Sequence, residues 1–215
     1  MRAYELEFLT VAGAHLLAVM SPGPDFAIVV KQSLRHGRRL AVWTSIGIAC
    51  GILLHVSYSL LGIGLLIKSS PWAFTVLKFA GAAYLAWIGV NALRARASQN
   101  ALQPGGEAVA PLAAGLSARA AWNIGFFTNA LNPKATLFFL ALFSVVIDPH
   151  TPRWVQAGYG AWMAVATGAW FTLVSFFFTR EKMRRVFLQH GHWVDRVMGV
   201  VLLGFAVRLA LATVG

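Results

Sequence analysis

The sequence predicts an all-α membrane protein with six transmembrane helices arranged as two inverted three-helix repeats. Two features of its composition predict this class: 58% of the 215 residues are hydrophobic, and only 12% are charged, about half the share in ordinary soluble domains. The third feature is the recurrence of apolar stretches of about 20 residues, the length of a helix that crosses a bilayer. A soluble enzyme and a disordered chain are therefore excluded.

Six apolar segments, separated by polar stretches, can be marked along the chain. Their approximate limits are 5–30, 40–67, 72–93, 120–147, 154–179 and 193–213. We expect one transmembrane domain over 1–215, with repeat one at about 5–93, a cytoplasmic linker at about 94–118 and repeat two at about 119–213. The linker contains the sequence Gln103-Pro104-Gly105-Gly106-Glu107, which is typical of a flexible connection.

The distribution of basic residues predicts the orientation of the chain. Eighteen Lys and Arg against seven Asp and Glu give a net charge of +11. One side collects Lys31, Arg35, Arg38, Arg39, Arg94, Arg96, Arg119, Arg180, Lys182, Arg184 and Arg185, and the other collects Arg2, Lys68 and Arg153. By the positive-inside rule the first side is cytoplasmic, so six crossings place both termini on the outer side of the membrane. The basic clusters lack stacking aromatic residues, so no nucleic-acid partner is expected.

The two halves of the sequence resemble each other weakly. Ser21-Pro22-Gly23 aligns with Asn132-Pro133-Lys134 at an offset of 111 residues, and the same offset places Trp43 on Trp154. Three helices per half would start the halves on opposite sides of the membrane. This pattern favours an inverted-topology repeat, the plan of many secondary transporters.

Proline inside a helix removes a backbone hydrogen bond and clashes with the preceding turn. We therefore expect the segment Ser21–Asp25 to break the first helix near mid-membrane, and Asn132-Pro133 to break the fourth. Ser21 and Asn132 precede prolines, and we expect them to cap the half-helices that begin there. The two half-helix starts would converge on an anion such as a carboxylate. The alternative is that the prolines only kink the helices.

Asp25 and Lys134 are the charged residues nearest these breaks. A charge at the bilayer centre costs at least about 2.5–3.5 kcal/mol, so such residues usually have a function. Asp25 could hold an ammonium group or exchange a proton, and Lys134 could hold a carboxylate; alternatively, the two pair and lock the halves together. The expected substrate-binding residues are Ser21, Pro22, Gly23, Pro24, Asp25, Asn129, Asn132, Pro133 and Lys134.

The remaining acidic residues are expected at helix ends or in loops, which would leave Asp25 as the only central carboxylate. They are Glu5, Glu7, Glu107, Asp148, Glu181 and Asp195. His15 and His55 lie in apolar segments and could ligate haem, but without supporting spacing we expect packed or hydrogen-bonded side chains. No metal or cofactor is expected. Gly47-x-x-x-Gly51 predicts close helix packing, within the chain or between chains.

Several segments together resemble the lysine exporter superfamily of bacterial efflux proteins, over nearly the whole chain. They are Val19–Asp25, Gly47–Gly51, Lys78–Gly89 and Asn129–Ala135. Within that superfamily, the Ser-Pro-Gly-Pro-Asp form and Ala169–Thr172 look most like the threonine and homoserine exporters. The resemblance implies a transporter in the bacterial inner membrane that exports amino acids by proton antiport, and not an enzyme.

With Asp25 as the only central carboxylate, a small neutral amino acid such as threonine or homoserine is the expected substrate. Its carboxylate would face Lys134 and its ammonium group Asp25, which would also be the proton-coupling residue. The alternatives are a basic amino acid or another small metabolite as substrate, an uncoupled efflux channel, and a membrane-embedded enzyme. The expected partners are the substrate and the lipid bilayer, and homo-oligomerisation is left open.

Overall fold

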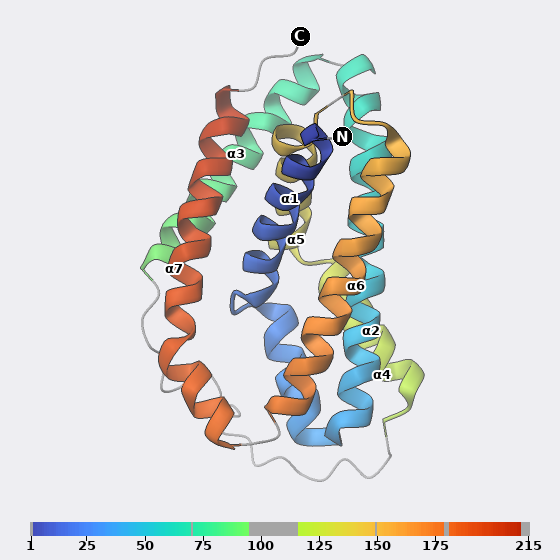
Figure 1. Cartoon of the computed structure of the whole chain (residues 1–215), viewed down its shortest axis with the longest axis vertical. Coiled ribbons are helices and arrows are strands. Elements are labelled where there is room, and N and C mark those ends of the chain that lie inside the picture. The colour runs from blue at the N-terminus through green and yellow to red at the C-terminus, as the bar shows by residue number, and fades with distance from the viewer. Residues whose placement is uncertain (1, 70, 95–115, 149, 179–180, 212–215) are drawn as a thin grey trace.

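The computed structural model describes residues 2–69, 71–94, 116–148, 150–178 and 181–211, and these are almost entirely helical (Figure 1). Within these ranges there is no β-strand, so the predicted all-α class is confirmed for this part of the chain. Most of the predicted linker, residues 95–115, lies outside the described residues.

The first apolar segment is broken where the prolines predict. Helix α1 covers Arg2–Met20, and helix α2 begins at Pro24 and extends to Ser69. The Ala27 amide donates to the Gly23 carbonyl at 2.9 Å, so Gly23 is the residue that precedes the helix. The prediction that Ser21 caps this helix is therefore wrong. Pro24 disfavours a helical conformation at the residue before it, which moves the helix start two residues beyond Pro22.

Helix α2 reverses direction within its length. Gly37 has φ 78 and ψ 174, a left-handed conformation that glycine adopts without steric cost. The part before Gly37 runs toward one end of the molecule, and the part after it returns (Figure 1). The polar stretch predicted to connect the first two apolar segments is thus a helical corner with exposed basic residues such as Lys31 and Arg35.

The later helices follow the predicted third, fourth and fifth segments, but the last of them begins before the predicted start of the sixth. Helix α3 covers Pro71–Leu93, α4 Ala118–Ala130, α5 Pro133–Ala141, α6 Arg153–Phe177 and α7 Glu181–Leu211, and a π-helical turn, η1, follows α5 at Leu142–Val146. The fourth segment is broken between α4 and α5. There the Asn132 side-chain oxygen accepts from the Lys134 amide at 3.0 Å, and Pro133 takes the first helical position. The predicted Asn132 cap is confirmed.

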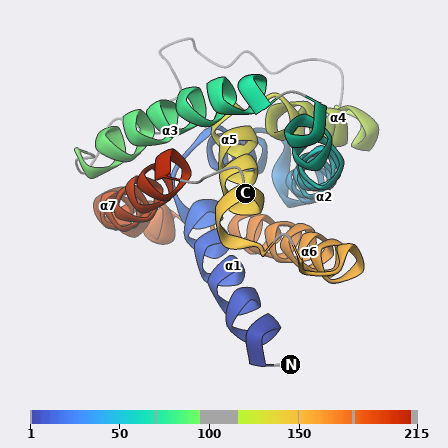
Figure 2. The same ribbon diagram turned by 90° about the horizontal axis from the view of Figure 1, so that it is seen from above.

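The helices pack so that α5 lies in the centre. Seen from above, α1, α2, α3, α6 and α7 surround it (Figure 2). Helix α2 packs against α4 and α6, and α3 packs against α7. A large apolar cluster fills the space between these helices and includes Val11, Leu85, Phe139, Met163 and Leu202, each at most 1% exposed.

Glycines allow α2 and α4 to touch along their backbones. A Cβ atom added to Gly47 would lie 2.1 Å from the Trp122 carbonyl oxygen, and one added to Gly125 would lie 2.0 Å from that of Thr44. The Thr44 hydroxyl donates to the Ala121 carbonyl at 3.1 Å. The close packing predicted for the Gly47 motif is therefore present within the chain. The end of α4 lies next to the first helix break, where Asn129 bonds to Asp25.

The outside of the helices is apolar. Leu9, Leu61, Trp87, Val165 and Val200 are all at least 59% exposed, as expected for side chains that face lipid. By length and mean hydropathy, Pro24–Leu61 and Arg153–Phe177 qualify as membrane spans among the described residues, and Pro133–Ser144 is a shorter apolar helix. Pro24–Leu61 includes the reversal at Gly37, so it is longer than one straight crossing.

Two of the acidic residues predicted to lie away from the centre meet at one end of the molecule. The Glu7 carboxylate accepts from the Asp148 amide at 2.8 Å and from the Thr151 hydroxyl at 3.1 Å. The backbone and ring N–H groups of His150 hold the pKa of exposed Asp148 below its usual value. These contacts join the first part of α1 to the loop before α6.

Candidate functional site

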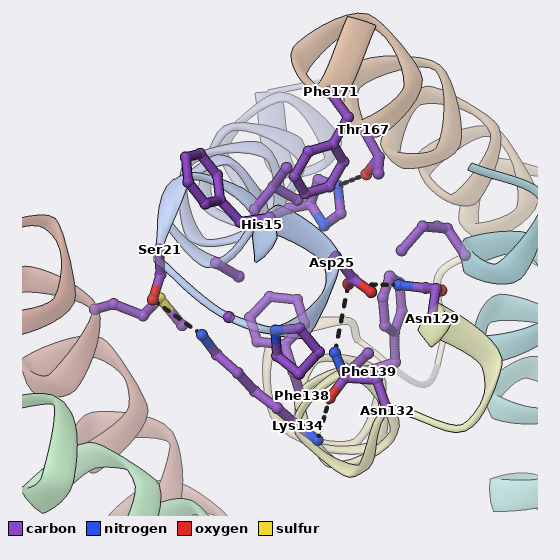
Figure 3. Close-up of a pocket in the computed structure, with 18 of the residues that line it drawn as sticks. His15, Ser21, Asp25, Asn129, Asn132, Lys134, Phe138, Phe139, Thr167 and Phe171 are labelled. Atoms are coloured by element: carbon purple, nitrogen blue, oxygen red, sulfur yellow. Dashed lines mark hydrogen bonds between the residues drawn. The ribbon is translucent and has the colours of Figure 1, made fainter. Parts of the chain in front are cut away.

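A cavity lies between the two helix breaks (Figure 3). Its volume is about 550 Å³, including its opening. Seven of the nine predicted site residues line it: Ser21, Gly23, Pro24, Asp25, Asn129, Asn132 and Lys134. Pro22 and Pro133 do not line the cavity. Both half-helix starts, α2 at Pro24 and α5 at Pro133, thus converge on one space, as predicted from the paired breaks.

Asp25 forms the acidic side of the cavity, in the first turn of α2. Its Oδ2 accepts hydrogen bonds from Nδ2 of Asn129 at 2.9 Å and Nδ2 of Asn132 at 3.4 Å. Its Oδ1 is buried and has no hydrogen-bond partner. The carboxylate is therefore anchored through one oxygen, and the other is available to a donor such as an ammonium group.

Lys134 forms the basic side, in the first turn of α5. Its Nζ donates to the Ser21 hydroxyl oxygen at 2.9 Å, and that hydroxyl donates to Oδ1 of Asp195 at 2.8 Å. Because Ser21 has one hydroxyl proton and gives it to Asp195, its oxygen can only accept from Lys134. This chain of hydrogen bonds fixes the lysine at the cavity and connects the first break, α5 and α7 through their side chains.

The position of Asp195 corrects a sequence prediction. Asp195 was expected at a helix end, away from the centre, yet it contacts Ser21 beside the first break. Asp195 lies near the start of the sixth apolar segment, but α7 continues well before that segment and begins at Glu181. Asp195 is thus more than three turns inside the helix, at the level of the break. The site has a second carboxylate as a result.

Asp25 and Lys134 do not pair directly. Among the described residues, the one ion pair within 4 Å joins exposed His150 and Asp148. Each charged residue at the cavity instead binds a neutral side chain from the opposite break: Asp25 binds Asn129 and Asn132, and Lys134 binds Ser21. Asp25 and Lys134 therefore do not lock the two halves together by forming an ion pair with each other.

His15 and His55 are both buried and hydrogen-bonded, as predicted. His15 Nε2 lies 3.1 Å from the Met163 carbonyl oxygen and 2.9 Å from the Thr167 hydroxyl oxygen. His55 Nε2 lies 3.0 Å from the Asn129 carbonyl oxygen, and its Nδ1 bonds to the Tyr58 hydroxyl. In the part of the chain that the structure describes, no three His, Cys, Asp or Glu residues are grouped as metal ligands would be.

The apolar wall of the cavity, and the position of His15 in that wall, were not expected from the sequence. The wall is formed by side chains of α2, α5, α6 and α7, namely Phe26, Ile52, Phe138, Phe139, Phe171, Met198 and Leu202. A helical period would have found some of them: Phe138 lies four residues after Lys134, and Phe171 four residues after Thr167. That signal depends on knowing which face of each helix is turned inward.

Apolar helices that are interrupted at a shared polar cavity are typical of a secondary transporter. The chain matches the LysE type translocator family over residues 16–213 and belongs to that family. It is therefore a membrane translocator and not an enzyme, as the resemblance implied.

Individual relatives cover most of the chain. It is 33% identical to the threonine efflux protein of Escherichia coli (strain K12) over 205 residues, which are 95% of this chain and 98% of that protein. It is 32% identical to the threonine efflux protein of Salmonella typhi, again over 205 residues, 95% of this chain and 98% of that protein. It is also 34% identical to the homoserine/homoserine lactone efflux protein of Salmonella typhimurium over 140 residues, 65% of this chain and 64% of that protein. No solved structure matches the chain.

Proposed function

We propose that this protein exports small neutral amino acids of the threonine and homoserine type across the bacterial inner membrane. The observation that carries the proposal is the pair of opposite charges at one cavity, each placed by a helix break: Asp25 at the start of α2 and Lys134 at the start of α5. An amino acid carries the complementary pair of charges. The names of the threonine and homoserine efflux relatives support the same substrate class.

The substrate carboxylate binds Lys134 and the free N–H groups at the half-helix starts. Its ammonium group binds Oδ1 of Asp25, which has no partner in the protein. Charge-assisted hydrogen bonds of this kind are about twice as strong as neutral ones, so they orient the ligand. The substrate side chain then lies against the apolar wall that includes Phe138 and Phe171.

A neutral substrate is favoured even though the site contains a second carboxylate. Asp195 accepts the Ser21 hydroxyl next to Lys134, so its charge offsets that of the lysine. Asp25 is then the carboxylate that remains for a ligand cation. A basic amino acid carries two cationic groups, and its second one would have to displace Ser21 from Asp195.

Alternating access around this cavity provides the transport cycle. The proposed topology has six crossings in two inverted repeats, with a cytoplasmic linker and periplasmic termini. Two features support it: the start of α1 and the end of α7 lie at the same end of the molecule, and α5 runs opposite to the first part of α2 (Figure 1). Proton antiport follows if Asp25 is protonated from the periplasm, because a neutral carboxyl group releases the ammonium group.

Counterflow in proteoliposomes tests this proposal. Vesicles that contain the protein are loaded with unlabelled threonine, and the uptake of labelled threonine is measured with homoserine, lysine or leucine as competitor. Competition by homoserine but not by lysine is expected. Stronger competition by lysine would establish a basic substrate instead, and the absence of counterflow with every amino acid would contradict a carrier. An imposed pH gradient should drive accumulation of threonine, whereas an uncoupled channel would show neither counterflow nor proton dependence.

A further inference from the structure

One nitrogen of His15 is an unused hydrogen-bonding group at the cavity. The His15 side chain lines the cavity and is 1% exposed, and its Nδ1 atom has no partner. In the close-up, the His15 ring lies beside Thr167, to which its other nitrogen bonds, on the side of the cavity where Phe171 lies (Figure 3). Buried polar atoms in proteins almost always have a partner, so an exception at a cavity points to a ligand.

The contacts of His15 determine what Nδ1 can do. Its Nε2 lies 3.1 Å from the Met163 carbonyl oxygen, and a carbonyl oxygen can only accept a hydrogen bond. Nε2 therefore carries the proton. A neutral imidazole has one such proton, so Nδ1 is left as an acceptor without a donor.

His55 shows that this arrangement is specific to His15. His55 is also fully buried, its Nε2 also lies near a backbone carbonyl oxygen, that of Asn129 at 3.0 Å, and its ring also packs on Phe139. However, Nδ1 of His55 bonds to the Tyr58 hydroxyl, and His55 does not line the cavity. The histidine away from the cavity has both nitrogens satisfied, and the histidine at the cavity has one acceptor to spare.

The other unpartnered polar atoms of the cavity narrow the choice of ligand group. Asn129 Oδ1 packs against Gly51, where an added Cβ would lie 2.6 Å from it. That leaves Asp25 Oδ1 and His15 Nδ1, both acceptors. Asp25 is charged and attracts the ammonium group more strongly than a neutral nitrogen does. His15 Nδ1 therefore suits a second, neutral donor on the same ligand.

The surroundings of His15 indicate which donor this is. The His15 ring centroid lies 6.2 Å from that of Phe138 and 5.9 Å from that of Phe139, both in the apolar wall. Nδ1 is thus a polar point in the region where the proposed function places the substrate side chain. A hydroxyl group on an otherwise apolar side chain matches such a surface.

We propose that His15 Nδ1 accepts a hydrogen bond from the side-chain hydroxyl of the substrate, so that the protein selects hydroxy amino acids over aliphatic ones of the same shape. This inference rests on the proposed function and deepens it, because it names the residue that binds the substrate side chain. Sites built to bond a substrate hydroxyl reject the analogue that lacks it, since the acceptor is then left unpaired. The expected preference is about 10- to 100-fold.

Pairs of substrates that differ only by a hydroxyl and a methyl group test the inference. Threonine is compared with valine, and homoserine with norvaline, as competitors of labelled threonine counterflow in proteoliposomes. The unmodified protein should prefer the hydroxy member of each pair. Equal competition within both pairs would overturn the inference and leave the proposed function intact. The absence of threonine counterflow would overturn the proposed function, and the inference with it.

Two conservative variants separate the acceptor from the structural hydrogen bond. His15→Gln places an amide N–H near the position of Nε2 and removes the acceptor at Nδ1, whereas His15→Asn keeps an amide group near Nδ1. We expect the threonine-to-valine ratio to fall to near one in His15→Gln and to be retained at least in part in His15→Asn.

His55→Gln is the matched control, because it changes an equally buried histidine that does not line the cavity. Its threonine-to-valine ratio should equal that of the unmodified protein, whatever its effect on thermal stability. A ratio that stays unchanged in His15→Gln, or that falls equally in His55→Gln, would overturn the assignment. Ligand-induced rises in Tm of the detergent-purified variants give the same ratio without transport, so a variant that folds but does not cycle still answers the question.

Discussion

The two helix breaks are stabilised by different kinds of side-chain contact. At the second break, Asn132 caps α5 with its own side chain, and two residues separate the helices. At the first break, three residues separate α1 from α2, and the Ser21 side chain does not cap α2 but bonds to Lys134 and Asp195. The second break is therefore stabilised locally, whereas the first depends on side chains of α4, α5 and α7.

Each charged residue of the site is supplied by one break and held by side chains of the other. Asp25 is supplied by the first break and held by Asn129 and Asn132 of the second, while Lys134 is supplied by the second and held by Ser21 of the first. A movement of one half against the other must change both sets of bonds.

Asp25→Asn should nearly abolish transport, with a loss of more than about 100-fold, because the ammonium group loses its buried counter-charge. The asparagine can still accept from Asn129, so the fold should be kept. Counterflow and pH-driven accumulation of threonine are the measurements. Asp148→Asn, at an exposed carboxylate, should behave like the unmodified protein. Proton-coupled transport by Asp25→Asn at the normal rate would refute the role given to this residue.

Lys134→Gln should weaken substrate binding by about 10- to 100-fold, the usual value of a hydrogen bond to a charged group. The loss should be smaller than in Asp25→Asn, because the N–H groups at the half-helix starts still face the carboxylate. Half-saturation concentrations in counterflow give the effect, with exposed Lys31→Gln as control. An unchanged half-saturation concentration in Lys134→Gln would remove this lysine from the binding site.

Gly47→Ala should destabilise the protein by about 1–3 kcal/mol, because its methyl group would clash with the α4 backbone at Trp122 and Phe126. Gly158, which the 111-residue offset places opposite Gly47 in the other half, has no atom within 4 Å of an added Cβ. Gly158→Ala should therefore be neutral, or stabilise by about 0.5–1 kcal/mol through helix propensity. Thermal unfolding compares the two, and equal shifts in Tm would contradict the packing described for α2 and α4.

Asn132→Ala and Ser21→Ala should differ in stability, because both side chains bond at the cavity but only that of Asn132 caps a helix. Asn132→Ala removes a helix cap, at a cost of about 0.5–2 kcal/mol, or a fall in Tm of about 1–8 °C. Ser21→Ala removes no cap, so its Tm should change less, but it breaks the connection from Lys134 to Asp195 and should slow counterflow. The reverse pattern, with the larger fall in Tm in Ser21→Ala, would show that the bonds from Ser21 to Lys134 and Asp195 stabilise the fold more than the Asn132 cap does.

The sequence predicts those parts of the site that depend on local chemistry. Both breaks follow from proline, which disrupts a helix wherever it occurs inside one, and the Asn132 cap follows from its place before Pro133. The prediction that Ser21 caps α2 is wrong because Pro24 disfavours a helical conformation at Gly23. The helix therefore begins at Pro24 and not at Pro22. The positions of Asp25 and Lys134 at one cavity follow from the pairing of the two breaks.

The rest of the site depends on how the helices pack, which the sequence does not state. Asp195 contacts Ser21 across 174 residues, and nothing around Asp195 distinguishes it from an acidic residue at a helix end. His15 is one of two histidines in apolar segments, and only their different neighbours in space, Thr167 and Tyr58, separate them. The residues of the apolar wall are of the same types, such as Phe, Ile and Leu, as exposed residues on the outside of the helices, so residue type does not distinguish them.

The exchange of bonds between the breaks has a consequence for synthesis at the ribosome. The hydrogen bond of Asp25 to Asn129 can form only after 104 more residues have been synthesised. The bond of Ser21 to Lys134 needs 113 more residues. At about 5–20 residues per second, that delay lasts about 5–20 s. During this interval the first break has an unpaired acid and open backbone groups that lipid cannot satisfy. The insertion machinery must therefore keep the first helices in contact with water or protein until the fourth segment arrives.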